Sequence, residues 1–143
     1  MTKAANLAAS ANATAGSVTA TTLQSNSAST PTVFKDSAGT EVGKLAKAWV
    51  AYNGVGQSIL SSFNVSSVTY GGTGSYTVNF TNAFSNTNYC IAMGSSTNNS
   101  GGLNATYCTA SSTTAVGLGT YSIAGGGAGA YRDTNGVYIA VFS

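Results

Sequence analysis

Apolar and polar residues alternate along most of the chain after residue 32, with the period of two that predicts β-strands. In residues 46–52, Ala48, Val50 and Tyr52 fall on one face and Trp49 falls on the other. Clusters of Gly, Asn, Ser and Asp separate such segments, as expected for turns. The pattern predicts strands at 33–35, 41–45, 46–52, 57–63, 89–93, 103–108, 114–120 and 137–142, a hairpin over 65–80, and a loop at 82–88 that places Phe84 in the core.

The expected hairpin over residues 65–80 defines its own register. Placing Tyr70 opposite Tyr76, and Val68 opposite Val78, puts the large side chains on one face, and a slip of one residue would replace them with polar ones. The connection is then five residues long and contains three glycines. We therefore expect either a longer loop or a bulge at this turn.

The composition of the chain changes near Pro31. All aromatic residues lie from Phe34 onward, and residues 1–30 hold few large apolar side chains. Such a segment cannot bury enough surface to offset its ordering entropy alone. We expect residues 1–30 to form an extended N-terminal arm for attachment or oligomerisation. Residues 31–143, which show no sustained helical period, are expected to form an all-β domain, a single antiparallel β-sandwich or barrel-like fold.

The residue types that catalysis uses are scarce. Charged residues make up 6% of the chain and histidine is absent, so a nucleophilic triad would lack its usual base. The acids are Asp36, Glu41 and Asp133, and they form neither a carboxylate pair nor a metal-ligand loop. Asp36 and Glu41 are expected to shape a turn and to pair with Lys35 or Lys44. We expect no catalytic residue, no bound metal and no cofactor.

Charge and cysteine usage narrow the classes of partner. A net charge of +2 is too small for a nucleic-acid footprint. No apolar stretch is long enough to insert in a membrane, and polar residues interrupt any signal-peptide core.

Cys90 and Cys108 are expected to be small buried apolar side chains, with a disulfide as the alternative if their strands are neighbours. Because the surface has little charge and exposed strand edges need covering, homo-oligomerisation is expected.

Tyrosines and Gly- or Asn-rich loops are the best candidates for a recognition surface. Tyr121, Tyr131 and Tyr138 lie close together in sequence, and Tyr with Ser, Gly and Asn is the composition of adaptable binding surfaces. An aromatic ring with neighbouring amides can also hold a sugar. The alternative is that these rings are buried in the core or in a subunit interface. The candidate receptor-binding residues are Asn98, Asn99, Tyr131, Arg132 and Asp133.

Two sequence blocks resemble a known group of proteins. One contains residues 32–43 and the run Trp49-Val50-Ala51-Tyr52-Asn53-Gly54. The other leads from residues 63–69 through Gly72-Thr73-Gly74-Ser75-Tyr76-Thr77-Val78-Asn79-Phe80 to residues 88–89. Together with residues 137–143, they resemble small tail-fibre or related virion proteins of tailed bacteriophages, especially phages of cyanobacteria and marine bacteria. The resemblance covers roughly residues 24–93 and the C-terminus, and residues 94–136 match least.

The resemblance implies a homotrimeric virion appendage, made in the host cytoplasm, with an N-terminal anchor and a β-rich part that faces the host. The expected function is a phage tail-fibre or baseplate-associated protein that mediates attachment to the host surface. Residues 1–30 would contact other virion proteins, and the loops would contact a host-surface polysaccharide. The alternative is a capsid decoration or cement protein that stabilises the head. A secreted non-viral lectin is a third class, for which a signal peptide would be expected.

Overall fold

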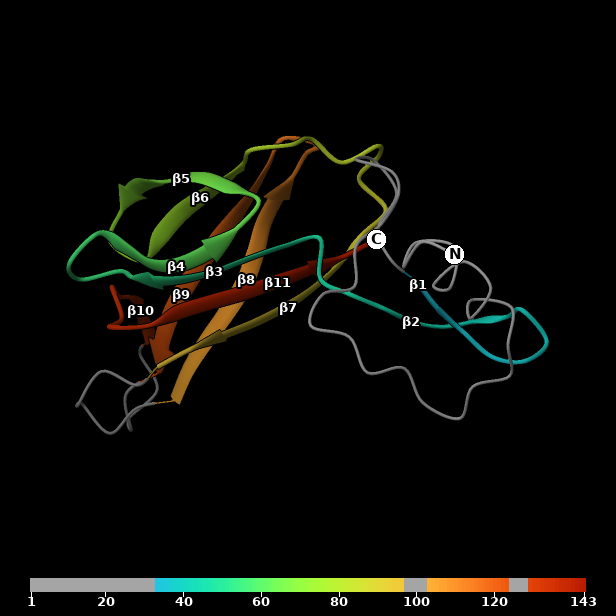
Figure 1. The fold of residues 1–143 in the computed structure, drawn as a ribbon. Helices are drawn as coiled ribbons and strands as arrows, with labels where there is room; N and C mark the ends of the chain where they lie inside the picture. The colour runs from blue at the N-terminus through green and yellow to red at the C-terminus, as the bar shows by residue number, and fades with distance from the viewer. Residues whose placement is uncertain (1–32, 97–102, 124–128) are drawn as a thin grey trace. The chain divides into compact units, whose positions relative to one another are not determined.

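The computed structural model describes residues 33–96, 103–123 and 129–143, and in these ranges the chain forms β-strands, turns and loops without a helix (Figure 1). The expected all-β class is therefore confirmed. The expected arm at residues 1–30, and Asn98 and Asn99, lie outside the described residues. In chain order the strands are β1 (Val33–Lys35), β2 (Glu41–Lys44), β3 (Ala48–Asn53), β4 (Ser58–Phe63), β5 (Val65–Gly72), β6 (Ser75–Phe80), β7 (Cys90–Ser95), β8 (Leu103–Ser111), β9 (Ala115–Ile123), β10 (Gly129–Tyr131) and β11 (Val137–Phe142).

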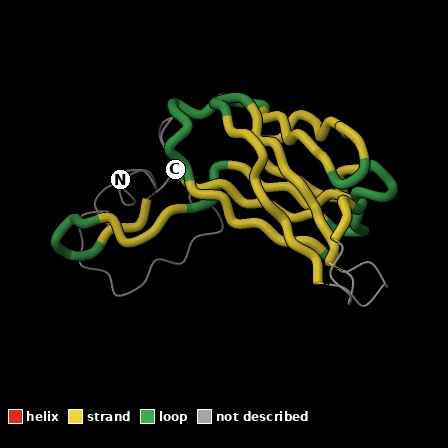
Figure 2. Tube along the Cα trace, turned by 180° about the vertical axis from the view of Figure 1, so that it is seen from behind, coloured by secondary structure: helices red, strands yellow, loops and turns green. Residues whose placement is uncertain are grey.

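Nine of these strands build two antiparallel sheets that pack face to face as a sandwich (Figures 1 and 2). The four-stranded sheet has the order β4-β3-β11-β7. In the five-stranded sheet, β9 pairs with β8 along one edge and with β6 and β10 along the other, and β5 pairs with β6. Strands β1 and β2 form a hairpin that pairs with neither sheet.

The core lies between the two sheets and is built from alternate residues of β3, β6, β9 and β11. On β3, burial alternates as the sequence predicts, with Trp49 facing outward. The loop after β6 returns Phe84 to the core, where its ring lies 4.7 Å from that of Phe80 and 5.0 Å from that of Tyr89. The buried apolar residues are Ala48, Val50, Tyr52, Tyr76, Val78, Phe80, Phe84, Val116, Leu118, Val137, Ile139 and Val141.

The hairpin of β5 and β6 has the register that the sequence predicts. Tyr70 pairs with Tyr76 and Val68 with Val78, and a bulge follows Tyr70 before the turn. Gly72 and Gly74 have φ angles of +124° and +67°, a region that residues with a Cβ atom seldom occupy. The glycines of this turn are therefore required by its backbone.

A single residue carries the chain from one sheet to the other. Strand β4 ends at Phe63 and β5 begins at Val65, so Asn64, with φ of 54°, forms the corner. Its side-chain carbonyl accepts the Asn82 N–H at 2.8 Å, and its amide group donates to the Lys47 and Asn82 carbonyls. Asparagine tolerates this left-handed conformation better than most residues, which explains its place here.

Two details differ from expectation. Cys90 and Cys108 are exposed and are not joined by a disulfide, so their predicted burial is wrong. They lie on β7 and β8, which are edge strands, and side chains there are not covered from both sides. The short strand β10 is also not evident from the sequence, because its Gly- and Ala-rich neighbourhood lacks the apolar alternation of a strand.

Candidate recognition surface

The outer face of the five-stranded sheet carries no charged side chain among the described residues. Sheet register places Thr69 and Thr77 outward on β5 and β6, with Gly117 and Tyr121 outward on β9. Alternate residues of these strands face the core instead. We call this surface the neutral face, and its outward residues are Ser67, Thr69, Ser75, Thr77, Asn79, Ala105, Tyr107, Ala115, Gly117, Gly119, Tyr121, Ile123 and Tyr131.

Three tyrosines from three strands form an aromatic cluster at one end of the neutral face. Tyr131 on β10 pairs with Tyr121 on β9, and the two rings meet edge to face at 5.5 Å and 85°. The Tyr107 ring on β8 lies 6.4 Å from that of Tyr131. Tyr131 is 54% exposed, and the two flanking rings are half-buried. We call these three residues the tyrosine cluster.

Glycines beneath the rings make this arrangement possible. The Tyr107 ring lies over Gly119, its cross-strand partner, and a Cβ atom at Gly119 would collide with that ring. The Tyr121 ring lies over Gly129 in the same way. The rings consequently lie across neighbouring strands, where they cover backbone that has no side chain of its own.

Hydrogen bonding within the cluster also affects its acid–base chemistry. A hydrogen bond with Tyr131, and secondarily burial and the neighbouring phenols, raise the pKa of Tyr107 above its ordinary value of 10.0. This hydrogen bond favours the neutral, protonated form of the Tyr107 phenol. Tyr107 therefore adds a hydroxyl group and a ring surface to the cluster.

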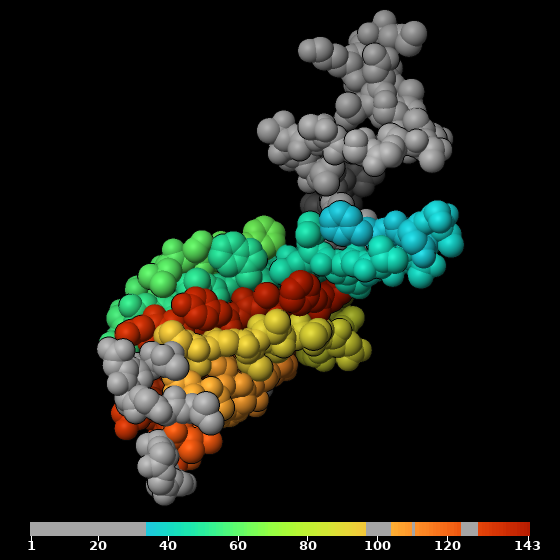
Figure 3. Space-filling view, turned by 90° about the horizontal axis from the view of Figure 1, so that it is seen from below, coloured from blue at the N-terminus to red at the C-terminus, as the bar shows by residue number. Residues whose placement is uncertain are grey.

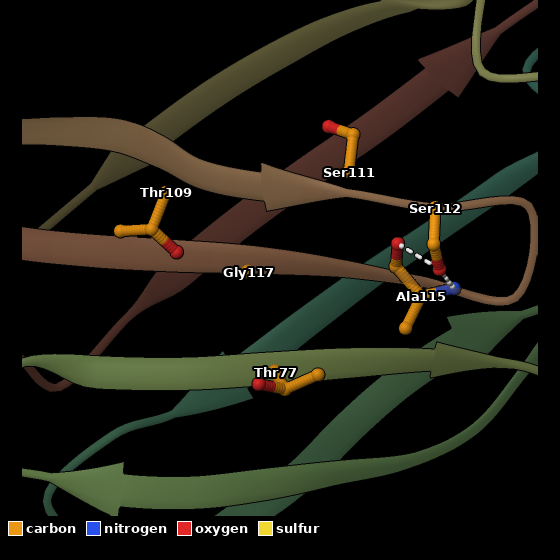
Figure 4. A pocket seen from close by; sticks show the side chains of 6 residues that line it. All are labelled: Thr77, Thr109, Ser111, Ser112, Ala115 and Gly117. Atoms are coloured by element: carbon orange, nitrogen blue, oxygen red, sulfur yellow. Dashed lines mark hydrogen bonds between the residues drawn. The ribbon is translucent and has the colours of Figure 1, made fainter.

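A shallow hollow of about 200 Å³ continues the neutral face beside the cluster. Figure 4 shows Gly117 of β9 between Thr77 of β6 and Thr109 of β8. At one end, Ser112 accepts the Ala115 N–H at 3.0 Å and donates to the Ala115 carbonyl at 3.2 Å. We call this feature the polar hollow, and its lining residues are Thr77, Thr109, Ser111, Ser112, Ala115 and Gly117.

Of the predicted site residues, Asp133 has an internal role. Its carboxylate accepts hydrogen bonds from the Gly74 N–H at 2.7 Å, the Tyr76 hydroxyl at 2.7 Å and the Tyr70 hydroxyl at 3.0 Å. Burial, followed by the bond to Asp133, raises the pKa of Tyr76 well above its usual range. Asp133 thus fixes the segment after β10 to the turn of the β5–β6 hairpin. Arg132 is exposed, and its backbone N–H bonds the Thr120 carbonyl at 3.2 Å.

The structure separates tyrosines that lie close together in the sequence. Tyr121 and Tyr131 share the neutral face, whereas Tyr138 on β11 faces outward from the four-stranded sheet and is 47% exposed. Tyr107 completes the cluster although the sequence did not single it out. The available clue was the pair of outward glycines at 117 and 119, which leave room for a ring from the adjacent strand.

A second exposed surface lies on the outer face of the four-stranded sheet. A row of outward residues crosses the sheet from Phe63 through Trp49 and Ala140 to Ala92, and β3, β11 and β7 lie side by side on this face in Figure 3. Phe63 and Trp49 are exposed. We call this surface the apolar face, and its outward residues are Trp49, Ala51, Asn53, Ser58, Ser61, Phe63, Cys90, Ala92, Gly94, Tyr138, Ala140 and Phe142.

Two specific features, a metal-ligand cluster and a membrane-spanning helix, are absent from the ranges that the structure describes. No group of three His, Cys, Asp or Glu side chains in those ranges could hold a metal ion. None of the described residues belongs to a helix long and apolar enough to cross a membrane.

The fold defines an all-β sandwich-like domain with two chemically different outer faces. In comparisons with known proteins, no family model, no curated protein and no solved structure matches the chain. Any functional assignment must therefore come from the chemistry of these faces and from the sequence itself.

Proposed function

We propose that this chain is a structural protein of a tailed-phage virion, tail-fibre or baseplate-associated, that mediates attachment to the host surface. The resemblance of residues 24–93 to small virion proteins motivates the setting. Residues 1–30 are the proposed contact with other virion proteins. The proposed role is binding and involves no chemical step.

The tyrosine cluster is the observation that carries the attachment role. Tyr131 keeps about half of its surface exposed although two rings flank it. Exposed aromatic groups that are held rigidly lose little entropy on binding, which makes them effective contact residues. The glycines beneath the rings leave the space that the rings need to lie across neighbouring strands.

The test has two parts, location and adhesion. Antibody or gold label on this protein is expected at the tail of purified particles, and soluble protein is expected to compete with particle adsorption to host cells. Label on the head surface, with no effect of soluble protein on adsorption, would contradict the proposal. That result would instead support the capsid decoration or cement role.

The apolar face favours assembly with further copies and is the feature that the decoration alternative would also use. We propose that the chain forms a homotrimer in which copies pack through this face. A face without charge meets a second copy without like-charge repulsion, and its rings gain from removal from water. Trp49→Lys is expected to shift the mass measured by light scattering from trimer toward monomer. A wild-type monomer at micromolar concentration would refute this assembly.

A further inference from the structure

The part of the neutral face on β5 and β6 presents hydroxyl and amide groups. The Asn79 side-chain amide donates to the Ser67 and Thr69 hydroxyls, both at 3.0 Å. These groups lie on β5 and β6, beside Thr77 at the rim of the polar hollow. Hydroxyl groups both donate and accept, so this surface can adapt to a ligand that is itself rich in hydroxyls.

The tyrosine cluster supplies an apolar contact that complements these hydroxyl and amide groups. A tyrosine presents an apolar ring with a polar tip, and the rings of Tyr121 and Tyr131 lie at 85° to each other, so the cluster is not a flat stack. Outward positions Gly117 and Tyr121 are four residues apart on β9, which is about 13 Å along a strand. The hollow and the cluster therefore lie along one line, and an extended ligand could touch both.

The charge of the face restricts the class of ligand. The outward residues of the neutral face include no Lys, Arg, Asp or Glu. Recognition of an anionic chain normally uses charged, often bidentate, partners. The neutral face has no charged side chain that could pair with an ionic group of a ligand. An uncharged ligand therefore fits it best.

We infer that the neutral face binds a neutral glycan chain, with the tyrosine cluster packing on the apolar face of one sugar and the polar hollow bonding to hydroxyls of its neighbours. This inference rests on the proposed attachment function and specifies its ligand. A protein receptor and an anionic polysaccharide are the alternatives that the experiment must separate.

The experiment uses full-length fluorescent protein and host cells to which it adheres. Periodate, which cleaves the vicinal diols of sugars, is expected to abolish adhesion, whereas protease treatment of the cells is not. Adhesion is also expected to persist at about 1 M NaCl, where the screening length falls to about 3 Å. Surface polysaccharide released from the same cells is separated by anion exchange, and the neutral fraction is expected to compete.

Matched variants place the site. Tyr131→Ala is expected to weaken binding of the neutral fraction about five- to tenfold, because an aromatic contact contributes about 1 kcal/mol beyond its buried area. Phe34→Ala is the control, since Phe34 is a similarly exposed aromatic residue, at 45%, on the β1–β2 hairpin, which belongs to neither the neutral face nor the apolar face. The control is expected to bind within twofold of wild type, and circular dichroism verifies that both variants are folded.

Each opposing result has a distinct meaning. Adhesion that is removed by protease and resists periodate would overturn the glycan inference while leaving the attachment function in place. Competition by the anionic fraction alone, or loss of adhesion in salt, would overturn the neutral class. Equal losses in Tyr131→Ala and Phe34→Ala would remove the site from the neutral face. Failure to adhere to cells that support growth of the particle would count against the attachment function itself.

Discussion

Replacing Asp133 is the most direct test of the internal network that holds the segment after β10 in place. In Asp133→Ala, the Gly74 N–H and the Tyr70 and Tyr76 hydroxyls lose their acceptor. Tyr76 is only 1% exposed, so its hydroxyl is expected to find no water in exchange. The variant should therefore be markedly less stable than the wild-type protein.

The size of this effect follows from the kinds of bond that are lost. Hydrogen bonds to a charged group contribute about 1.5–3 kcal/mol each, and neighbouring bonds are not additive. We expect Asp133→Ala to lower the free energy of unfolding by about 3–5 kcal/mol. Asp133→Asn keeps one carbonyl acceptor and should cost about 1–2 kcal/mol, and Tyr70→Phe, which removes the longest of the three bonds, about 1 kcal/mol.

Urea unfolding followed by the fluorescence of Trp49, the single tryptophan, measures these differences. The order expected is Ala, then Asn, then Tyr70→Phe, from most to least destabilised. If Asp133→Ala lowered the free energy of unfolding by less than about 0.5 kcal/mol, the carboxylate would not hold the segment after β10 to the β5–β6 turn as its contacts suggest. Equal losses in the Asn and Ala variants would show that the charge matters more than the number of acceptors.

Three further predictions concern pH, the glycine beneath the Tyr107 ring and the core. Since burial and a carboxylate raise the pKa of Tyr76, its stabilising contribution is complete below pH 10.0 and should decline as the pH rises above that value; unchanged urea midpoints between pH 9 and pH 11 would contradict this. Gly119→Ala should push the Tyr107 ring aside, change the near-ultraviolet circular dichroism and cost about 1 kcal/mol. Gly43→Ala, whose new methyl group would meet only the Phe34 side chain at an ordinary distance of 3.8 Å, should stay within about 0.5 kcal/mol of wild type. Phe84→Ala should cost about 3–5 kcal/mol in urea unfolding, and a loss below 1 kcal/mol would show that the loop carrying it is not part of the core.

The sequence was informative wherever a local pattern determines the structure. Alternation places Val50 and Tyr52 in the core, and the size of Tyr70 and Tyr76 determines the register of the β5–β6 hairpin. The burial of Phe84 was predictable because a large aromatic side chain in a polar loop tends to be buried away from water. These features depend on neighbours within one strand or one hairpin.

The remaining features depend on which strands lie side by side, and this is not encoded locally. Tyr107 and Tyr131 meet across β9, and Tyr138 is separated from them because β11 belongs to the other sheet. The cysteines were predicted to be buried because composition does not show that β7 and β8 are edge strands. Asp133 looked like a surface group, since the hydroxyls that bind it come from residues about sixty positions earlier.

The position of β11 has a consequence for how the domain folds. Strand β11 is the middle strand between β3 and β7, and β7 pairs with no other described strand. The hairpins β3–β4, β5–β6 and β8–β9 can form from contacts that are close in sequence, whereas β11 pairs with β3, more than eighty residues earlier, and with β7, more than forty residues earlier. Contacts of such long sequence separation form slowly. We expect the five-stranded sheet to assemble first, and folding to finish when β11 inserts and closes the second sheet.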